Sequence, residues 1–239
     1  MEHLRMHAEA FESELKEGEV SMGTTIMAIT FDGGVTLGAD SRTSTGNYIA
    51  NRVTDKLTQL TDNVFVCRSG SAADTQAITA YVQYYLHQHQ MELNDEILVK
   101  TAASFATKLV YSNKEMLQAG LIVAGYDSQE GGQVFGLPLG GTLVKVPFAI
   151  GGSGSGYITG FCDKYWRPGM SAEQAEDFVR RAVGHALARD GSSGGCIRTV
   201  TISKAGVKRT FTPNDEIPPM YGGVGYQAKQ AAPTPMVQA

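Results

Sequence analysis

The stretch MGTTIMAITFDGGVTLGADS, residues 22–41, sets the architecture of the chain. An apolar, β-branched run over residues 24–31 is followed by Asp32, Gly33 and Gly34, and a second apolar run then covers residues 35–41. Two such runs around a glycine-rich turn predict a β-hairpin. Both runs are apolar at most positions, so we expect the hairpin to lie in a sheet that is covered on both faces.

Strands and helices alternate in blocks along the rest of the chain. Strands are predicted within 47–53 and 56–60, as a second extended pair, and within 63–70, 120–127, 132–139, 142–150 and 196–211. Helices are predicted over 71–93, 98–117 and 171–189, with a short helical stretch after the glycine cluster at 151–156. Ser71 with Asp74 and Ser171 with Gln174 have the spacing of N-terminal capping boxes.

This order predicts an α+β fold. Short hairpin connections imply antiparallel sheets, and strands that are apolar on both faces must be covered twice. We therefore expect a four-layer αββα sandwich, in which two antiparallel sheets are flanked by helices.

The composition predicts one large domain and excludes several classes of partner. Of 239 residues, 42% are hydrophobic and 18% are charged, and the net charge of −4 comes with no basic stripe, so neither nucleic acid nor a membrane is an expected partner. Cys67, Cys162 and Cys196 form no disulfide framework, which indicates a reducing compartment. The five histidines have no metal-ligand spacing, so no metal site is expected.

The pair Gly23-Thr24 stands where a polar extension meets the first apolar run. A threonine hydroxyl is a weak nucleophile without a nearby base. A cut before Thr24 would create an α-amine with a pKa of about 7.7–8.0, which could serve as that base. Glycine on the acyl side would let the hydroxyl approach its own preceding carbonyl. Taken alone, such a pair is far more often an ordinary strand start.

Six further motifs give this pair its meaning. They are TTIMA (24–28), GADSRT (38–43), YIANRVTDKL (48–57), CRSGSAADTQ (67–76), GGSGS (151–155) and RDGSSGG (189–195). In their order and spacing, from Gly23 to about Phe211, the chain resembles the catalytic β subunits of the proteasome core particle, which are N-terminal-nucleophile hydrolases. Among these subunits the resemblance is to the caspase-like kind, which cuts after acidic residues.

The resemblance assigns roles to the motif residues. Thr24 would be the nucleophile, exposed by cleavage of the Gly23–Thr24 bond, and Lys56 would lie beside it. Asp40 would pair with Lys56. Ser153, Asp190 and Ser193 would hydrogen-bond and orient the α-amine, and the backbone N–H of Gly70 would face the oxyanion of the tetrahedral intermediate.

The same resemblance places Arg68 in the pocket for the substrate residue before the cut, with Thr43, Thr54 and Ala72 lining it. A guanidinium can grip an acidic side chain bidentately and repels a basic one. The inducible counterpart has an apolar residue here, so the chain resembles the constitutive form.

The resemblance also implies the organisation and setting of the protein. Residues 1–23 would be a propeptide and 24–217 the catalytic domain. Residues 218–239 do not match the family closely, and their Pro, Gly, Ala and Gln content predicts an irregular tail. The partners would be other proteasome α and β subunits in a barrel of stacked seven-membered rings, acting in ubiquitin-dependent degradation in the cytoplasm and nucleus. No cofactor is implied.

Two alternatives remain open. A structural β subunit would fill the ring without chemistry, but such subunits lack the threonine or its lysine, and Thr24 and Lys56 are both present. Another N-terminal-nucleophile enzyme, such as an amidase for small amides, would not be expected to carry both CRSGSAADTQ and RDGSSGG.

Overall fold

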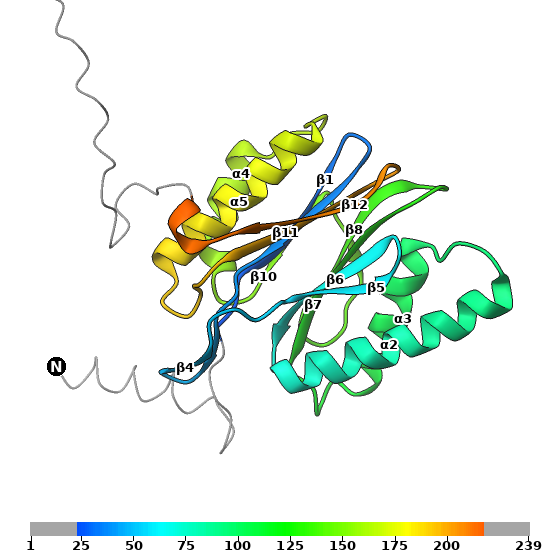
Figure 1. The fold of residues 1–239 in the computed structure, drawn as a ribbon. Helices are drawn as coiled ribbons and strands as arrows, with labels where there is room; N and C mark the ends of the chain where they lie inside the picture. The colour runs from blue at the N-terminus through cyan, green and yellow to red at the C-terminus, as the bar shows by residue number, and fades with distance from the viewer. Residues whose placement is uncertain (1–22, 218–239) are drawn as a thin grey trace, which may run out of the picture.

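Two five-stranded antiparallel sheets are stacked between two pairs of helices in the computed structural model, which describes residues 23–217 (Figure 1). The first sheet has the order β10-β1-β2-β11-β12, formed by Phe148–Gly151, Ile26–Phe31, Gly34–Ala39, Ile197–Ser203 and Gly206–Thr212. The second has the order β5-β6-β7-β8-β9, formed by Leu57–Thr61, Val64–Gly70, Ala119–Asp127, Gly131–Leu137 and Val144–Lys145. A small separate ribbon pairs β3 (Thr43–Thr45) with β4 (Tyr48–Asn51).

Three buried apolar clusters define the four layers. Helices α2 (Ala72–Leu93) and α3 (Val99–Ser112) pack against the second sheet, and α4 (Ser155–Tyr165) and α5 (Ala172–Arg189) pack against the first (Figure 1). Between the sheets, Leu37 and Phe65 belong to a third cluster. The predicted αββα sandwich is confirmed.

The β1–β2 hairpin is confirmed and carries the candidate nucleophile. Its register pairs Ile26 with Ala39 and Phe31 with Gly34. All six residues of β2 are buried, as expected for a strand between β1 and β11 with a helix layer on one side and a sheet on the other. Because Thr24 lies just before β1 and Asp40 just after β2, this register brings the two side by side.

Two strand predictions are wrong. The runs 47–53 and 56–60 do not pair with each other, because β4 pairs with β3, and β5 pairs with β6. The run 142–150 is not one strand, since it divides into β9 in the second sheet and β10 in the first. Pro147 separates them, and a proline has no N–H to continue a ladder. Its carbonyl instead accepts the Thr30 N–H at 2.8 Å.

Two predicted helix ends also change. Helix α3 stops at Ser112 and not at residue 117, and the side chain of Asn113 donates to the Leu109 carbonyl at 2.9 Å. At the start of α2, the Ser71 hydroxyl accepts the Asp74 N–H. The return bond of a capping box is missing.

The loop before β7 explains that missing bond. The Ser71 N–H donates to the Gln118 carbonyl at 2.8 Å, and the Asp74 carboxylate accepts the Gln118 N–H at 3.0 Å. The capping box at Ser171 and Gln174 is complete, as predicted.

The remaining expectations concern the ends of the chain and special groups. After β12 the chain continues through Pro213 into a short 3-10 turn over Asn214–Glu216. The predicted propeptide, apart from Gly23, and the predicted tail at 218–239 lie outside the described residues. Within 23–217, no helix has the length and apolar character needed to cross a bilayer. No group of three or more potential metal ligands gathers in that range either. All three cysteines are free.

Candidate active site

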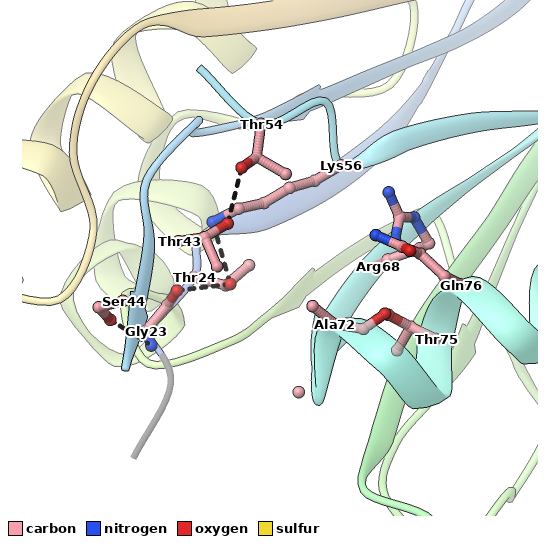
Figure 2. A pocket seen from close by; sticks show the side chains of 11 residues that line it. Gly23, Thr24, Thr43, Ser44, Thr54, Lys56, Arg68, Ala72, Thr75 and Gln76 are labelled. Atoms are coloured by element: carbon pink, nitrogen blue, oxygen red, sulfur yellow. Dashed lines mark hydrogen bonds between the residues drawn. The ribbon is translucent and has the colours of Figure 1, made fainter. Parts of the chain in front are cut away.

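Thr24 stands at the entrance to β1, still joined to Gly23 by a peptide bond, and its side chain is buried. The Thr24 hydroxyl donates to the carbonyl oxygen of Gly23 at 2.6 Å. The ammonium of Lys56 donates to the same Thr24 oxygen at 3.0 Å (Figure 2). The hydroxyl therefore lies between the carbonyl of the Gly23–Thr24 peptide bond and a cation.

Lys56 is held by a buried ion pair with Asp40, and its Nζ lies 2.6 Å from Oδ1. Burial lowers the pKa of Lys56, and the nearby Asp40 carboxylate opposes that shift. Asp40 also accepts the backbone N–H groups of Thr25, Arg42 and Gly194 at 3.0–3.2 Å. Both oxygens of this carboxylate therefore accept hydrogen bonds. Removing either partner of such a pair leaves a buried charge, at a cost of roughly 3–5 kcal/mol.

A chain of hydrogen-bonded hydroxyl and carboxyl groups leads to the Thr24 nitrogen. The Thr24 N–H donates to Ser153 Oγ at 3.1 Å, and Ser153 donates to Asp190 Oδ2 at 2.7 Å. Ser193 also donates to Asp190 Oδ2, at 2.6 Å, but its other contact is the Thr25 hydroxyl at 2.7 Å. Among the three residues expected to orient the amine, only Ser153 touches the nitrogen. Ser193 is tied to the neighbouring threonine.

The backbone around Thr24 is fixed by ladder-like bonds. The Gly154 N–H donates to the Thr24 carbonyl at 3.2 Å, and the Asp40 N–H donates to the Thr25 carbonyl at 3.1 Å. Gly152 has φ of +81°, and a Cβ atom there would lie 2.1 Å from the Thr24 carbonyl oxygen. The glycine at position 152 therefore has a steric reason, because only glycine lets this loop approach the Thr24 backbone so closely.

Gly70 ends β6 one residue before the N-cap of α2. Its φ is +97°, and a Cβ atom would lie 2.3 Å from the Gln118 carbonyl oxygen. A side chain at this position would be both strained and obstructed. The site thus requires glycine here, and Gly70 also borders the cavity beside Thr24.

A cavity of about 30 Å³ lies beside Thr24; Figure 2 shows the residues that line it. It brings together the four predicted pocket residues with Thr24, Lys56 and Gly70; the complete lining is Gly23, Thr24, Thr43, Ser44, Thr54, Lys56, Arg68, Gly70, Ala72, Thr75 and Gln76. The sequence reasoning missed three of them. Thr75 and Gln76 follow Ala72 by three and four positions on α2, so helical spacing would have indicated both. Ser44 follows Thr43 on β3, and no comparable signal pointed to it.

Arg68 forms part of the wall of this cavity and is half-buried. Its Nη2 donates to the backbone carbonyl of Asp55 at 2.7 Å, while its buried Nε has no partner within the described residues. Burial lowers the pKa of Arg68 and the charge of Asp55 opposes this. Across the cavity, the hydroxyls of Thr43 and Thr54 are hydrogen-bonded at 2.7 Å. An unmet N–H beside a small polar cavity favours an anionic guest.

Replacing Gly23 with alanine is expected to slow cleavage before Thr24 by about tenfold or more, since small misplacements at a reacting bond are costly. A Cβ at Gly23 would lie 1.9 Å from Ser192 Cβ and 2.5 Å from the Ser192 carbonyl oxygen. The measurement is a time course of intact mass after synthesis.

The processed product of that variant is chemically identical to the normal one, so its activity per processed chain should be unchanged. Gly191→Ala is the matched control. Gly191 lies in the same loop as Ser192, and nothing lies within 4 Å of a Cβ atom added there. Normal processing of Gly23→Ala would show that the Gly23–Ser192 contact does not position the bond.

Comparison with known proteins places this geometry in one family. The family described as Proteasome subunit matches residues 20–202. The chain is 58% identical to Proteasome subunit beta type-6 of Arabidopsis thaliana, over 82% of this chain and 84% of that protein. It is 54% identical to Proteasome subunit beta type-6 of Dictyostelium discoideum, over 88% and 98%. It is also 54% identical to Proteasome subunit beta type-1 of Saccharomyces cerevisiae, over 85% and 94%. The chain therefore belongs to the proteasome subunit family, as a β-type subunit.

Proposed function

We propose that the chain is the threonine endopeptidase subunit of the proteasome core that cleaves peptide bonds after acidic residues, the caspase-like activity. The observation that carries this proposal is the place of the Thr24 hydroxyl, which contacts both the Gly23 carbonyl oxygen and the Lys56 ammonium. A structural subunit would not need a buried Lys56–Asp40 ion pair whose ammonium contacts the Thr24 hydroxyl. Because buried ion pairs are costly to form, the presence of this one supports a catalytic role.

Maturation begins with the Thr24 hydroxyl attacking the Gly23 carbonyl carbon. The acyl group passes from the Thr24 nitrogen to its oxygen, and water then hydrolyses the resulting ester. The products are a propeptide that ends in a Gly23 carboxylate and a chain that begins with the Thr24 α-amine.

The mature residue then acts on peptides by the same chemistry. Thr24 Oγ1 attacks the substrate carbonyl carbon, and the α-amine takes the hydroxyl proton through a water and returns it to the leaving amine. Water releases the acyl-enzyme. The Lys56 cation lowers the pKa of the α-amine by like-charge repulsion and that of the hydroxyl by ion pairing. Ser153, supported by Asp190, orients the amine, and the Gly70 N–H binds the oxyanion.

The cavity beside Thr24 accepts the side chain that precedes the cut. Arg68 supplies a cation there, and the Thr43, Thr54 and Ala72 side chains shape the walls. An acidic side chain satisfies the unpartnered Arg68 N–H, whereas a basic side chain is repelled.

The setting follows from family membership. The subunit assembles with other α and β subunits in the stacked rings of the core particle and takes part in ubiquitin-dependent degradation. We place it in the cytoplasm and nucleus, and the three free cysteines fit a reducing compartment. Fluorescence microscopy of the tagged full chain tests that placement, and confinement to another compartment would contradict it.

The mature chain recovered from assembled particles is expected to begin at Thr24-Thr25. Intact mass and N-terminal sequencing measure this, with the unassembled chain as the comparison. The alternative, a structural subunit, predicts instead that fully assembled particles retain Gly23 and the extension, because the self-cleavage chemistry would be absent.

A further inference from the structure

Residues 53–57 connect the β3–β4 ribbon to β5 and carry two parts of the proposed site. Thr54 lines the specificity cavity, and Lys56 reaches the nucleophile. Only Leu57 of the segment belongs to a strand, so the segment needs other contacts to hold its shape. Both functions depend on where its backbone lies.

Three arginines donate to the carbonyls of this segment. Arg198 donates through Nη1 to the Thr54 carbonyl and through Nη2 to the Val53 carbonyl, both at 3.0 Å. Arg209 donates to the Leu57 carbonyl at 3.0 Å, and Arg68 donates to the Asp55 carbonyl at 2.7 Å. The fifth carbonyl, that of Lys56, accepts the backbone N–H of Arg68 at 3.0 Å. Every backbone acceptor of the segment is thus occupied; the residues involved are Val53, Thr54, Asp55, Lys56 and Leu57.

Arg198 is the best placed of the three to act as a fixed support. It lies on β11, opposite Ala39 of β2 and hence one residue from Asp40. Its guanidinium stacks over the Phe211 ring at 5.3 Å from the centroid. A planar guanidinium can span two consecutive carbonyls with its two nitrogens, which a lysine ammonium cannot reproduce.

Leu57 packs in the cluster between the two sheets, but the segment is incompletely packed beside Arg198 and Arg209. A cavity of about 180 Å³ opens there, and Asp55, Leu57, Arg198 and Arg209 are among its lining residues. Besides the arginines, the Thr54 N–H donates to the Ser41 carbonyl at 3.0 Å, so without Arg198 the Val53 and Thr54 carbonyls would have free volume into which to shift. The ion pair between Arg209 and Asp55, at 3.5 Å and largely exposed, offers little resistance.

We propose that Arg198 is a positioning residue for both catalysis and acidic specificity, with Arg209 in support. By gripping the Val53 and Thr54 carbonyls, Arg198 keeps Lys56 Nζ against Thr24 Oγ1 and keeps Thr54 in the cavity wall. It touches neither the nucleophile nor the substrate. This inference rests on the proposed function.

The test compares Arg198→Met and Arg198→Lys with Lys208→Met, each expressed in place of the native subunit in assembled particles. Lys208 is the matched control because it lies on β12 and its side chain bonds to Glu176 on α5 and to no residue of the segment among those described. The readouts are kcat and KM for peptides with Glu or Leu before the cut, per chain that begins at Thr24, together with the melting temperature.

Arg198→Met is expected to lower kcat after Glu by about tenfold or more, because displacement of a reacting group by even 1 Å is costly. Its KM for the Glu peptide should rise and its preference for Glu over Leu should fall. Arg198→Lys should recover part of this loss, and Lys208→Met should match the parent. A merely structural role would lower the melting temperature and leave kcat per processed chain unchanged.

Unchanged kcat and Glu preference in the arginine variants would overturn the inference while leaving the proposed function intact. If Arg198→Met does not enter particles, Arg198→Lys and Arg209→Met decide by the same criteria. A parent particle whose processed chain does not cut after Glu would overturn the proposed function itself, and with it this inference.

Discussion

The chain with alanine in place of Thr24 is expected to keep its extension and to show no cleavage after acidic residues. The Thr24 hydroxyl is the group that contacts the Gly23 carbonyl. Without it, neither self-cleavage nor attack on a peptide has a nucleophile. Loss of the nucleophile in a comparable serine protease lowers kcat by about 10⁶-fold. Intact mass and hydrolysis of a peptide that contains Glu measure the two effects separately.

Thr24→Ser is the matched control, since it retains the hydroxyl beside Lys56 and should still be processed. Removal of the extension from Thr24→Ala at the same bond would show that a neighbouring active subunit trims the chain. Cleavage after Glu by the trimmed alanine chain would contradict the assignment of Thr24 as nucleophile.

Arg68→Leu is expected to reverse the preference of the cavity. Truncating one member of a buried charge pair costs about 2–5 kcal/mol, so kcat/KM for a Glu peptide should fall by a factor of about 30 or more. Leucine also gives the cavity an apolar wall, so cleavage after Leu should rise. The measurement is kcat/KM for matched peptides that differ only in the residue before the cut.

Arg68→Lys separates charge from geometry in the same experiment. It keeps a cation but loses the fork that can bind a carboxylate bidentately, so an intermediate Glu preference is expected. If Arg68→Leu kept the full preference for Glu, the specificity would come from another residue, and the proposed role of Arg68 would be wrong.

The parts of the site that the sequence predicted lie within short contiguous motifs. The β1–β2 hairpin could be predicted because its turn residues and its apolar runs are adjacent, and its register then places Thr24 beside Asp40. Lys56 and Arg68 came from the family resemblance, and in the structure both line the cavity beside Thr24.

The parts that could not be predicted depend on contacts between distant segments. The run 142–150 looks continuous, and only the packed sandwich shows that β9 and β10 belong to different sheets. Ser193 was expected near the α-amine, yet the hydroxyl of Thr25 lies within its reach. Arg198 carries no local signal at all, because its partners are carbonyls about 145 positions earlier in the chain.

A newly cut chain end normally frays, because the first residues lose the constraint of their predecessor. The end created at Thr24 is an exception, since the backbone bonds from Gly154 to Thr24 and between Thr25 and Asp40 do not involve Gly23. Cleavage therefore releases the amine without releasing the residue that bears it. We therefore expect the proposed nucleophile to keep the restricted conformational freedom of an interior residue after cleavage, so that little entropy is lost when its hydroxyl aligns with a substrate.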